Sequence, residues 1–278
     1  MENTKDSALK QKEESLPIGK EAIMDKIAKK NDFFADFDFD KLEIDIREMF
    51  KSGVHFGHQK ARKNPKMDEY VFITKNGINI IDLQKTVEKL EEARAFIEKI
   101  VSEGQQILLV GTKKQAKNIV LSLAKRVGMP YVVERWLGGT FTNFAVIAKR
   151  TKFLRDGQEK LKRGEYSQYT KFEQMKIEEE LESLENKMGG IKNMPKLPGA
   201  VFLTGAIEDN LALKEAKIKK VPIIALVDTN VDPGDVDYKI PANEDAVSSL
   251  QLMLAYIGQA ILKGKEKIKK PEAPVVKK

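Results

Sequence analysis

The residues best suited to bind a polyanion are concentrated between Lys51 and Lys66, in the sequence KSGVHFGHQKARKNPK. This stretch holds five lysines or arginines and both histidines of the chain, and it contains no acid. Lysine and arginine neutralise phosphates, while Phe56 and the imidazoles can stack on bases. The mixture favours contact with folded RNA over the alternative, an ordinary solvated basic turn.

Further basic residues occur in three other segments. Lys113, Lys114 and Lys117 lie at the start of a predicted helix, whose free amides could also bind a phosphate. Arg135-Trp136 precedes two glycines, which indicates a tight loop whose backbone approaches another group; a buried structural tryptophan is the equal alternative. The complete set of residues expected to bind RNA is Lys51, His55, His58, Lys60, Arg62, Lys63, Asn64, Lys66, Lys113, Lys114, Lys117, Arg135, Trp136, Lys149, Arg150 and Lys152.

No catalytic or metal constellation is complete in the sequence. His55 and His58 are spaced i, i+3, but a zinc site needs at least three protein ligands, and the chain has no cysteine, no third histidine and no carboxylate nearby in sequence. There is no HExxH and no cysteine nucleophile. We therefore expect no metal, no cofactor and no enzymatic activity.

A nucleotide-binding enzyme is the alternative function. Gly111-Thr112-Lys113 follows a buried strand, and Asp228 and Asp232 follow another, where doubly wound folds usually bind ligands. However, neither GxxxxGK[ST] nor GxGxxG occurs in the chain. The segment Asp228–Gly234 resembles the start of a calcium loop, but Pro233 and Lys239 occupy positions that need glycine and glutamate. We expect Asp228 and Asn230 to cap this loop instead.

Composition agrees with a globular protein that has a polyanionic partner. The 278 residues are 41% hydrophobic and 33% charged, and the net charge is +7 with a pI near 9.2. The absence of cysteine fits a reducing compartment. The first residues have no apolar core of the kind that a signal peptide needs, and no apolar run is long enough to span a membrane. A cytoplasmic location is expected.

Short aliphatic runs alternate with helical patterns, which predicts an α/β fold with a mostly parallel, doubly wound sheet. Residues 70–73 and 78–81 are expected to pair as a β-hairpin through Asn76-Gly77. The remaining predicted strands are 107–110, 131–133, 200–203 and 222–227, and the predicted helices are 83–101, a segment that ends at Gly128, 211–217 and 245–262.

From Asn143 to about Lys187 no strand pattern occurs, and two charged helices joined by a turn at residues 164–167 are predicted. We call residues 143–189 the helical hairpin. Asn143 is expected to cap its first helix, which is basic, whereas the second is rich in glutamate. Apolar seams are expected to join the helices as a coiled coil, and such a hairpin projects from the body unless it is folded flat on the sheet. The seam residues are Phe153, Leu154, Leu161, Phe172, Met175, Ile177, Leu181, Leu184 and Met188.

Charge and composition divide the chain into four parts. Residues 1–42 are expected to form a flexible extension, whose phenylalanines at 33, 34, 37 and 39 could dock on a partner or pack on the protein itself. Residues 43–142 and 190–264 form the α/β domain, which binds RNA, with the helical hairpin inserted in it. Residues 265–278, rich in lysine and proline, are expected to be a disordered basic tail.

Several short motifs of this sequence resemble those of one known family, the bacterial second protein of the small ribosomal subunit. The resemblance runs over residues 43–264 and departs from the family at 204–209, where TGAIED replaces the usual strand-ending Asp-Pro turn. The matching words are GVHFGHQ at 53–59, NPKM at 64–67, NGI-x-IIDLQKT at 76–86, VGTKKQA at 110–116, RWLGG at 135–139, TNF at 142–144, GGIK at 189–192 and VDTN-x-DP at 227–233.

The resemblance implies a flavodoxin-like domain with a protruding helical hairpin, bound to small-subunit ribosomal RNA between the head and the body, near the messenger exit. It implies a structural role in subunit assembly and translation, without catalysis. Neighbouring ribosomal proteins are the implied partners, among them the large messenger-binding protein of the subunit.

Overall fold

The computed structural model describes residues 33–34 and 37–269. The chain divides into two compact units, Met1–Asp36 and Phe37–Lys278. Of the first unit only Phe33 and Phe34, which form a turn, are described. Most of the predicted N-terminal extension and the predicted tail from residue 270 onward lie outside the described residues. All helices and strands named below belong to the second unit.

Five strands form an all-parallel sheet in the order β5-β4-β6-β7-β8. They are β4 (Ile107–Val110), β5 (Tyr131–Val132), β6 (Ala200–Leu203), β7 (Ile223–Val227) and β8 (Tyr238–Pro241). Every residue of β4, β6 and β7 is buried, as expected for strands covered by helices on both faces. In chain order the arrangement is 2-1-3-4-5, the flavodoxin-like form of a doubly wound sheet. The predicted fold class is confirmed.

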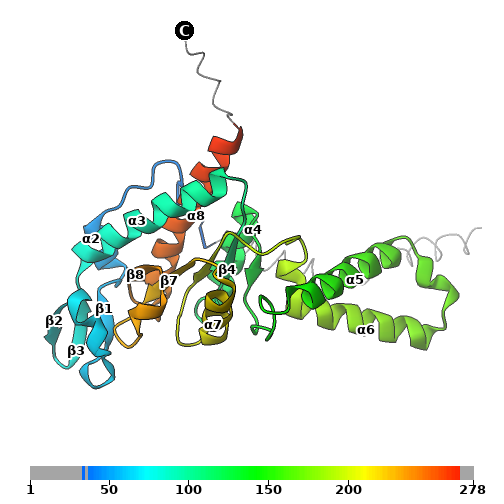
Figure 1. Cartoon of the computed structure of the whole chain (residues 1–278), viewed down its shortest axis with the longest axis horizontal. Helices are drawn as coiled ribbons and strands as arrows, with labels where there is room; N and C mark the ends of the chain where they lie inside the picture. The colour runs from blue at the N-terminus through cyan, green and yellow to red at the C-terminus, as the bar shows by residue number, and fades with distance from the viewer. Residues whose placement is uncertain (1–32, 35–36, 270–278) are drawn as a thin grey trace, which may run out of the picture. The chain divides into compact units, whose positions relative to one another are not determined.

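Helices cover this sheet (Figure 1). α3 (Leu83–Ser102), α4 (Lys117–Val127) and α8 (Val247–Lys269) pack together, and α7 (Asn210–Lys219) buries Ala212 and Leu213 in one cluster with side chains of β4, β6 and β7. The side chain of Asp82 caps α3 by accepting a hydrogen bond from the Gln84 amide at 3.0 Å. Among the helices within residues 37–269, none has the length and hydrophobicity of a membrane-spanning segment.

A second, three-stranded antiparallel sheet has the order β1-β3-β2. The predicted β-hairpin is confirmed as β2 (Val71–Lys75) and β3 (Ile78–Ile81), joined by Asn76 and Gly77 with φ of 52° and 77°. β1 (Phe56–Gln59) adds to the other edge of β3 and carries part of the basic stretch. The short helices α2 (Ile46–Lys51), η1 (Lys60–Arg62) and η2 (Pro65–Tyr70) complete this region.

The helical hairpin consists of α5 (Phe144–Lys162) and α6 (Lys171–Met188), which lie side by side and extend away from the sheet in Figure 1. The short helices η3 (Glu165–Gln168) and η4 (Gly189–Ile191) follow α5 and α6. Leu154, Leu181 and Met188 of the predicted seam are buried, whereas Phe153 and the other outer members are exposed. The predicted pair of helices is present, and its coiled-coil geometry stays a prediction. The exposed outer members are Leu161, Phe172 and Met175.

The structure differs from the expected elements in several places. β1, β8, α2 and the short helix η5 (Pro233–Asp235) were not expected, because segments this short carry too few residues to show a period. Asn143 precedes α5, but its side chain makes no capping hydrogen bond, which corrects its predicted role. α8 continues to Lys269, into the first residues of the predicted tail, and Lys267 there pairs with Glu98 of α3 at 2.9 Å.

Candidate nucleic-acid interface

The basic stretch folds into β1, η1 and the start of η2. Two of its cations form ion pairs with acidic residues that the structure describes, and the others do not. Lys63 pairs with Asp68, and Lys66 pairs with Asp232 at 2.7 Å. Lys60 and Arg62 are exposed and make no ion pair within residues 37–269. The side chain of Asn64 caps η2, and its backbone N–H donates a hydrogen bond to the carbonyl of Thr229 at 2.8 Å. The exposed cations of this stretch that lack an acidic partner among these residues therefore include Lys60 and Arg62 on η1. Lys51, on α2, is also exposed.

The two histidines occupy different environments. The side chain of His55 is buried, with 6% of its surface exposed, and its ring stacks on Phe50 at a centroid distance of 4.2 Å. Burial lowers the pKa of His55, so it is neutral at neutral pH. His55 is thus an interior residue that supports the loop, whereas His58 lies at the mouth of a polar cluster.

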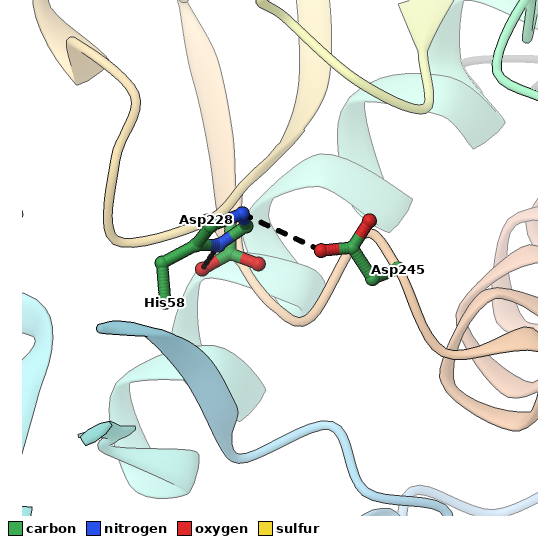
Figure 2. Close-up of side chains that lie close together, drawn as sticks. All are labelled: His58, Asp228 and Asp245. Carbon is green, nitrogen blue, oxygen red and sulfur yellow. Dashed lines mark ion pairs between the residues drawn. The ribbon is translucent and has the colours of Figure 1, made fainter. Parts of the chain in front are cut away.

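His58 lies between two carboxylates that the sequence places far away (Figure 2). Its Nδ1 is 3.1 Å from Oδ1 of Asp228, which follows β7, and its Nε2 is 3.4 Å from Oδ2 of Asp245, which follows β8. The hydrogen bond with Asp228 raises the pKa of His58, and this effect outweighs burial. The arrangement suits an imidazolium, because each ring nitrogen faces its own acceptor.

These three residues could also hold a metal ion. Each of His58, Asp228 and Asp245 offers one ligand atom, and these atoms lie within 4.8 Å of one another. The sequence showed no carboxylate near His58, but the fold brings two carboxylates, Asp228 and Asp245, next to it. An ion there would need one imidazole nitrogen and both carboxylates to converge on a single point, in place of the two separate contacts of the present arrangement. An open pocket of about 380 Å³ adjoins the cluster, and its lining includes Phe56, Arg62 and Asn243.

Lys113 is held by carboxylates at the same edge of the sheet. Its Nζ lies 2.6 Å from Asp245, 3.2 Å from Glu244 and 3.6 Å from Glu208. Burial alone would lower the pKa of Lys113, but these acids outweigh it and raise the pKa. Burial raises the pKa of Glu244 to about 7 against the effect of Lys113. Lys113 is therefore engaged with three carboxylates of this edge of the sheet.

The other cations of this helix start differ from Lys113. Lys117 pairs with Glu134 at 2.8 Å, whereas Lys114 is exposed and makes no ion pair within the described range. Beside them, Thr112 donates a hydrogen bond of 2.7 Å to Asp209, a residue with 1% exposure whose pKa is raised by burial to about 6. The residues suggested for a phosphate site thus face acids, which disfavours an anionic nucleotide.

The loop that contains Arg135 and Trp136 closes around a carboxylate that the sequence gave no reason to expect. Trp136 is buried and meets Phe141 edge-on at a centroid distance of 5.0 Å. Its indole nitrogen donates to Glu215 of α7 at 3.2 Å. Arg135 is exposed. Trp136 is thus a buried structural residue, and the backbone of its loop also approaches another group, the carboxylate of Glu215.

The hairpin cations that were expected to bind RNA lie on α5. Lys149, Arg150 and Lys152 are exposed and make no ion pair with any described residue. The exposed acids of the hairpin are concentrated on α6, as the sequence predicted. The fold therefore brings His58 and Lys113 together through Asp245, and it keeps the cations of α5 on a separate element.

The strand order, the inserted helical hairpin and the two groups of unpaired cations define an α/β doubly wound protein with basic surfaces on its loops and on one helix. Residues 49–264 match the family model described as Ribosomal protein S2, and the chain belongs to this family. The resemblance found in the sequence is thereby confirmed.

Curated relatives agree with this assignment. The chain is 46% identical over 232 residues to the small ribosomal subunit protein uS2 of Roseiflexus sp. (strain RS-1), a match that covers 84% of this chain and 88% of that protein. It is 47% identical over 221 residues to the protein of the same name from Chloroflexus aurantiacus (strain ATCC 29366 / DSM 635 / J-10-fl), covering 80% and 93%.

Proposed function

We propose that this chain is a structural constituent of the small ribosomal subunit, where it binds ribosomal RNA and supports subunit assembly and translation. Membership of the Ribosomal protein S2 family and the names of the relatives support this proposal. As a ribosomal component it would act in the cytoplasm, and its role would be non-catalytic.

The observation that carries the RNA-binding role is the distribution of cations without an acidic partner. Lys60 and Arg62 on η1, together with Lys149, Arg150 and Lys152 on α5, are exposed and unpaired within the described residues. A cation already paired with a carboxylate must lose that partner to bind a phosphate, whereas an unpaired one binds without this cost. These five residues are therefore our first candidates for phosphate contacts.

A position between the head and the body of the subunit, near the messenger exit, is also part of the proposal. Neighbouring ribosomal proteins would be further partners, with the large messenger-binding protein among them. The antiparallel sheet supports a protein contact, because Phe56, Phe72 and Ile73 expose 48%, 73% and 52% of their surfaces there. Electron microscopy of subunits purified from the native organism would test this placement.

Charge reversal at η1 tests the RNA contacts. We expect K60E/R62E protein to leave the small-subunit fractions of a sucrose gradient, because two phosphate contacts become repulsive. The matched control is K99E/K219E, which makes the same charge change at two exposed lysines outside the candidate surfaces. Wild-type occupancy of the subunit by K60E/R62E would refute the assignment of these two contacts.

The nucleotide-binding alternative is not favoured. Calorimetry with ATP, GTP and NAD on the purified protein would test it directly, and we expect no binding, because Lys113 and Thr112 are engaged with acids. Micromolar affinity for any of the three nucleotides would revive this alternative.

A further inference from the structure

The carboxylate of Glu215 receives hydrogen bonds from four residues of one loop. Its Oε1 accepts from the indole nitrogen of Trp136 at 3.2 Å and from the amide of Gly139 at 2.7 Å. Its Oε2 accepts from the amide of Phe141 at 2.9 Å, and from the amide and hydroxyl of Thr142 at 3.1 and 3.2 Å. The loop thus forms a concave array of N–H groups, of the kind that binds anions, and the anion is a side chain of α7.

These hydrogen bonds keep Glu215 ionised. The side chain exposes only 5% of its surface, and burial by itself would raise its pKa. The amides of Thr142, Gly139 and Phe141 and the indole of Trp136 outweigh burial, so the pKa of Glu215 is lowered. No lysine or arginine of the described residues pairs with it, and the charge is compensated by the dipoles of the loop.

The backbone of the loop is shaped for this role. Gly139 has φ of +91°, a conformation that residues with a Cβ rarely adopt. The Asn143 amide, immediately before α5, donates to the carbonyl of Gly139 at 2.8 Å. The side chain of Asn143 provides no cap, so this backbone hydrogen bond joins the loop that holds Glu215 to the first turn of α5, whose Ile147 packs in the core. The cations Lys149, Arg150 and Lys152 follow on that helix.

We propose that Glu215 is a positioning residue of the RNA-binding surface: it fixes the loop Trp136–Thr142 and, through it, the direction of α5 and its cations. This inference rests on the proposed RNA-binding function. Glu215 itself does not touch RNA, since it is buried and its carboxylate is enclosed by the loop.

The chain provides its own probe, because Trp136 is the only tryptophan. The experiment compares wild-type protein with E215Q, and with E180Q as a control that removes one exposed charge from α6. Tryptophan emission reports the loop, circular dichroism reports the fold, and filter binding to small-subunit RNA reports the surface. We expect E215Q to shift the emission and to weaken RNA binding about tenfold, while E180Q changes neither property. E215D, which keeps the charge, should recover part of the affinity.

A double-mutant cycle separates positioning from a general effect. The variant K149A/R150A/K152A removes the cations that the loop would orient. If Glu215 acts through them, E215Q added to this triple variant should cause little further loss of affinity. A loss that adds in full to that of the triple variant would overturn the inference.

Two further results would also overturn it: unchanged emission in E215Q, or shifted emission with wild-type RNA affinity. If E215Q does not fold, G139A tests the same loop through its backbone, and normal RNA affinity with shifted emission in G139A would refute the positioning role. Failure of the wild-type protein to bind small-subunit RNA would refute the proposed function itself, and this outcome is distinct from a normal affinity in E215Q.

Discussion

The imidazole Nδ1 of His58 lies 3.1 Å from Oδ1 of Asp228, although one residue belongs to the basic stretch and the other follows β7. Asp228 is also tied to the backbone, since its Oδ1 accepts from the Thr229 amide at 2.6 Å. The amide of His58 in turn donates to the hydroxyl of Thr229 at 2.9 Å. The basic stretch is therefore attached to the carboxyl end of the parallel sheet by His58.

His58 should make stability fall as the pH rises. Its pKa in the folded protein is raised, so its contribution is complete below the unfolded value of 6.5 and is lost as the pH rises through the folded value. A hydrogen bond between charged partners contributes about 2 kcal/mol. We expect the free energy of unfolding to fall between pH 6 and alkaline pH, and to fall less in H58Q, as measured by urea unfolding. Identical pH profiles for H58Q and wild type would contradict the ion pair.

Glu244 should act in the same direction in a lower pH range. Burial raises its folded pKa to about 7, so the folded protein holds a proton that the unfolded chain releases near pH 4.5. Stability should therefore decrease by on the order of 3 kcal/mol between those two pH values. E244Q should lack this decrease, and the comparison uses urea midpoints across the range. A pH dependence in E244Q as steep as in wild type would argue against a buried, proton-holding carboxyl.

We expect Lys113 to contribute to the stability of the fold and not to RNA binding. Replacement by methionine removes the cation shared by Glu208, Glu244 and Asp245. Because Glu244 can take up a proton, we expect the cost of an unsatisfied buried polar group, about 1–3 kcal/mol. We expect a large fall in the urea midpoint of K113M, partly recovered in K113M/E244Q. K114M, in which an exposed neighbour is changed, is the control and should unfold like wild type. A wild-type midpoint for K113M would mean that Lys113 is available for RNA after all.

Close packing at two glycines should stabilise the helical hairpin and its junction with the domain. A Cβ at Gly190 would lie 2.2 Å from the carbonyl oxygen of Tyr131 in β5, and a Cβ at Gly157 would lie 2.6 Å from Cδ2 of Leu181. We expect G190A to destabilise by about 1–3 kcal/mol and G157A by less, because a side chain can move more easily than a backbone carbonyl. G138A has open space around it and serves as the control. Equal melting temperatures for G190A and G138A would disprove the close approach.

Acid should release the loop around Trp136. Because the folded pKa of Glu215 is lowered, the stability it provides is present above its unfolded pKa and is lost as the pH falls through the folded value. Tryptophan emission of the wild-type protein should shift only at a pH below the ordinary glutamate pKa of 4.5, and E215Q should lack this transition. An acid transition of equal size in both proteins would show that another group controls the loop.

Much of the scaffold follows from local patterns. The aliphatic runs of β4, β6 and β7 show buried strands, because only a sheet covered on both faces tolerates so many consecutive apolar residues. Asn76-Gly77 specifies the turn between β2 and β3 through its positive φ angles. Local sequence patterns also predicted the capping of α3 by Asp82 and the two helices of the hairpin. The motifs shared with the family were enough to predict the fold and the class of function.

The amino-acid order places the cations along the chain, and the fold separates the cations that pair with acids from those that stay exposed. Lys60 and Lys113 look alike as letters, yet one is exposed and the other is held between acids that follow β6 and β8. Periodicity records only near neighbours along the chain, whereas charge pairing depends on residues that meet after the chain has crossed the sheet. Glu215 shows the same limit, because one glutamate on a charged helix carries no sign of the loop that surrounds it.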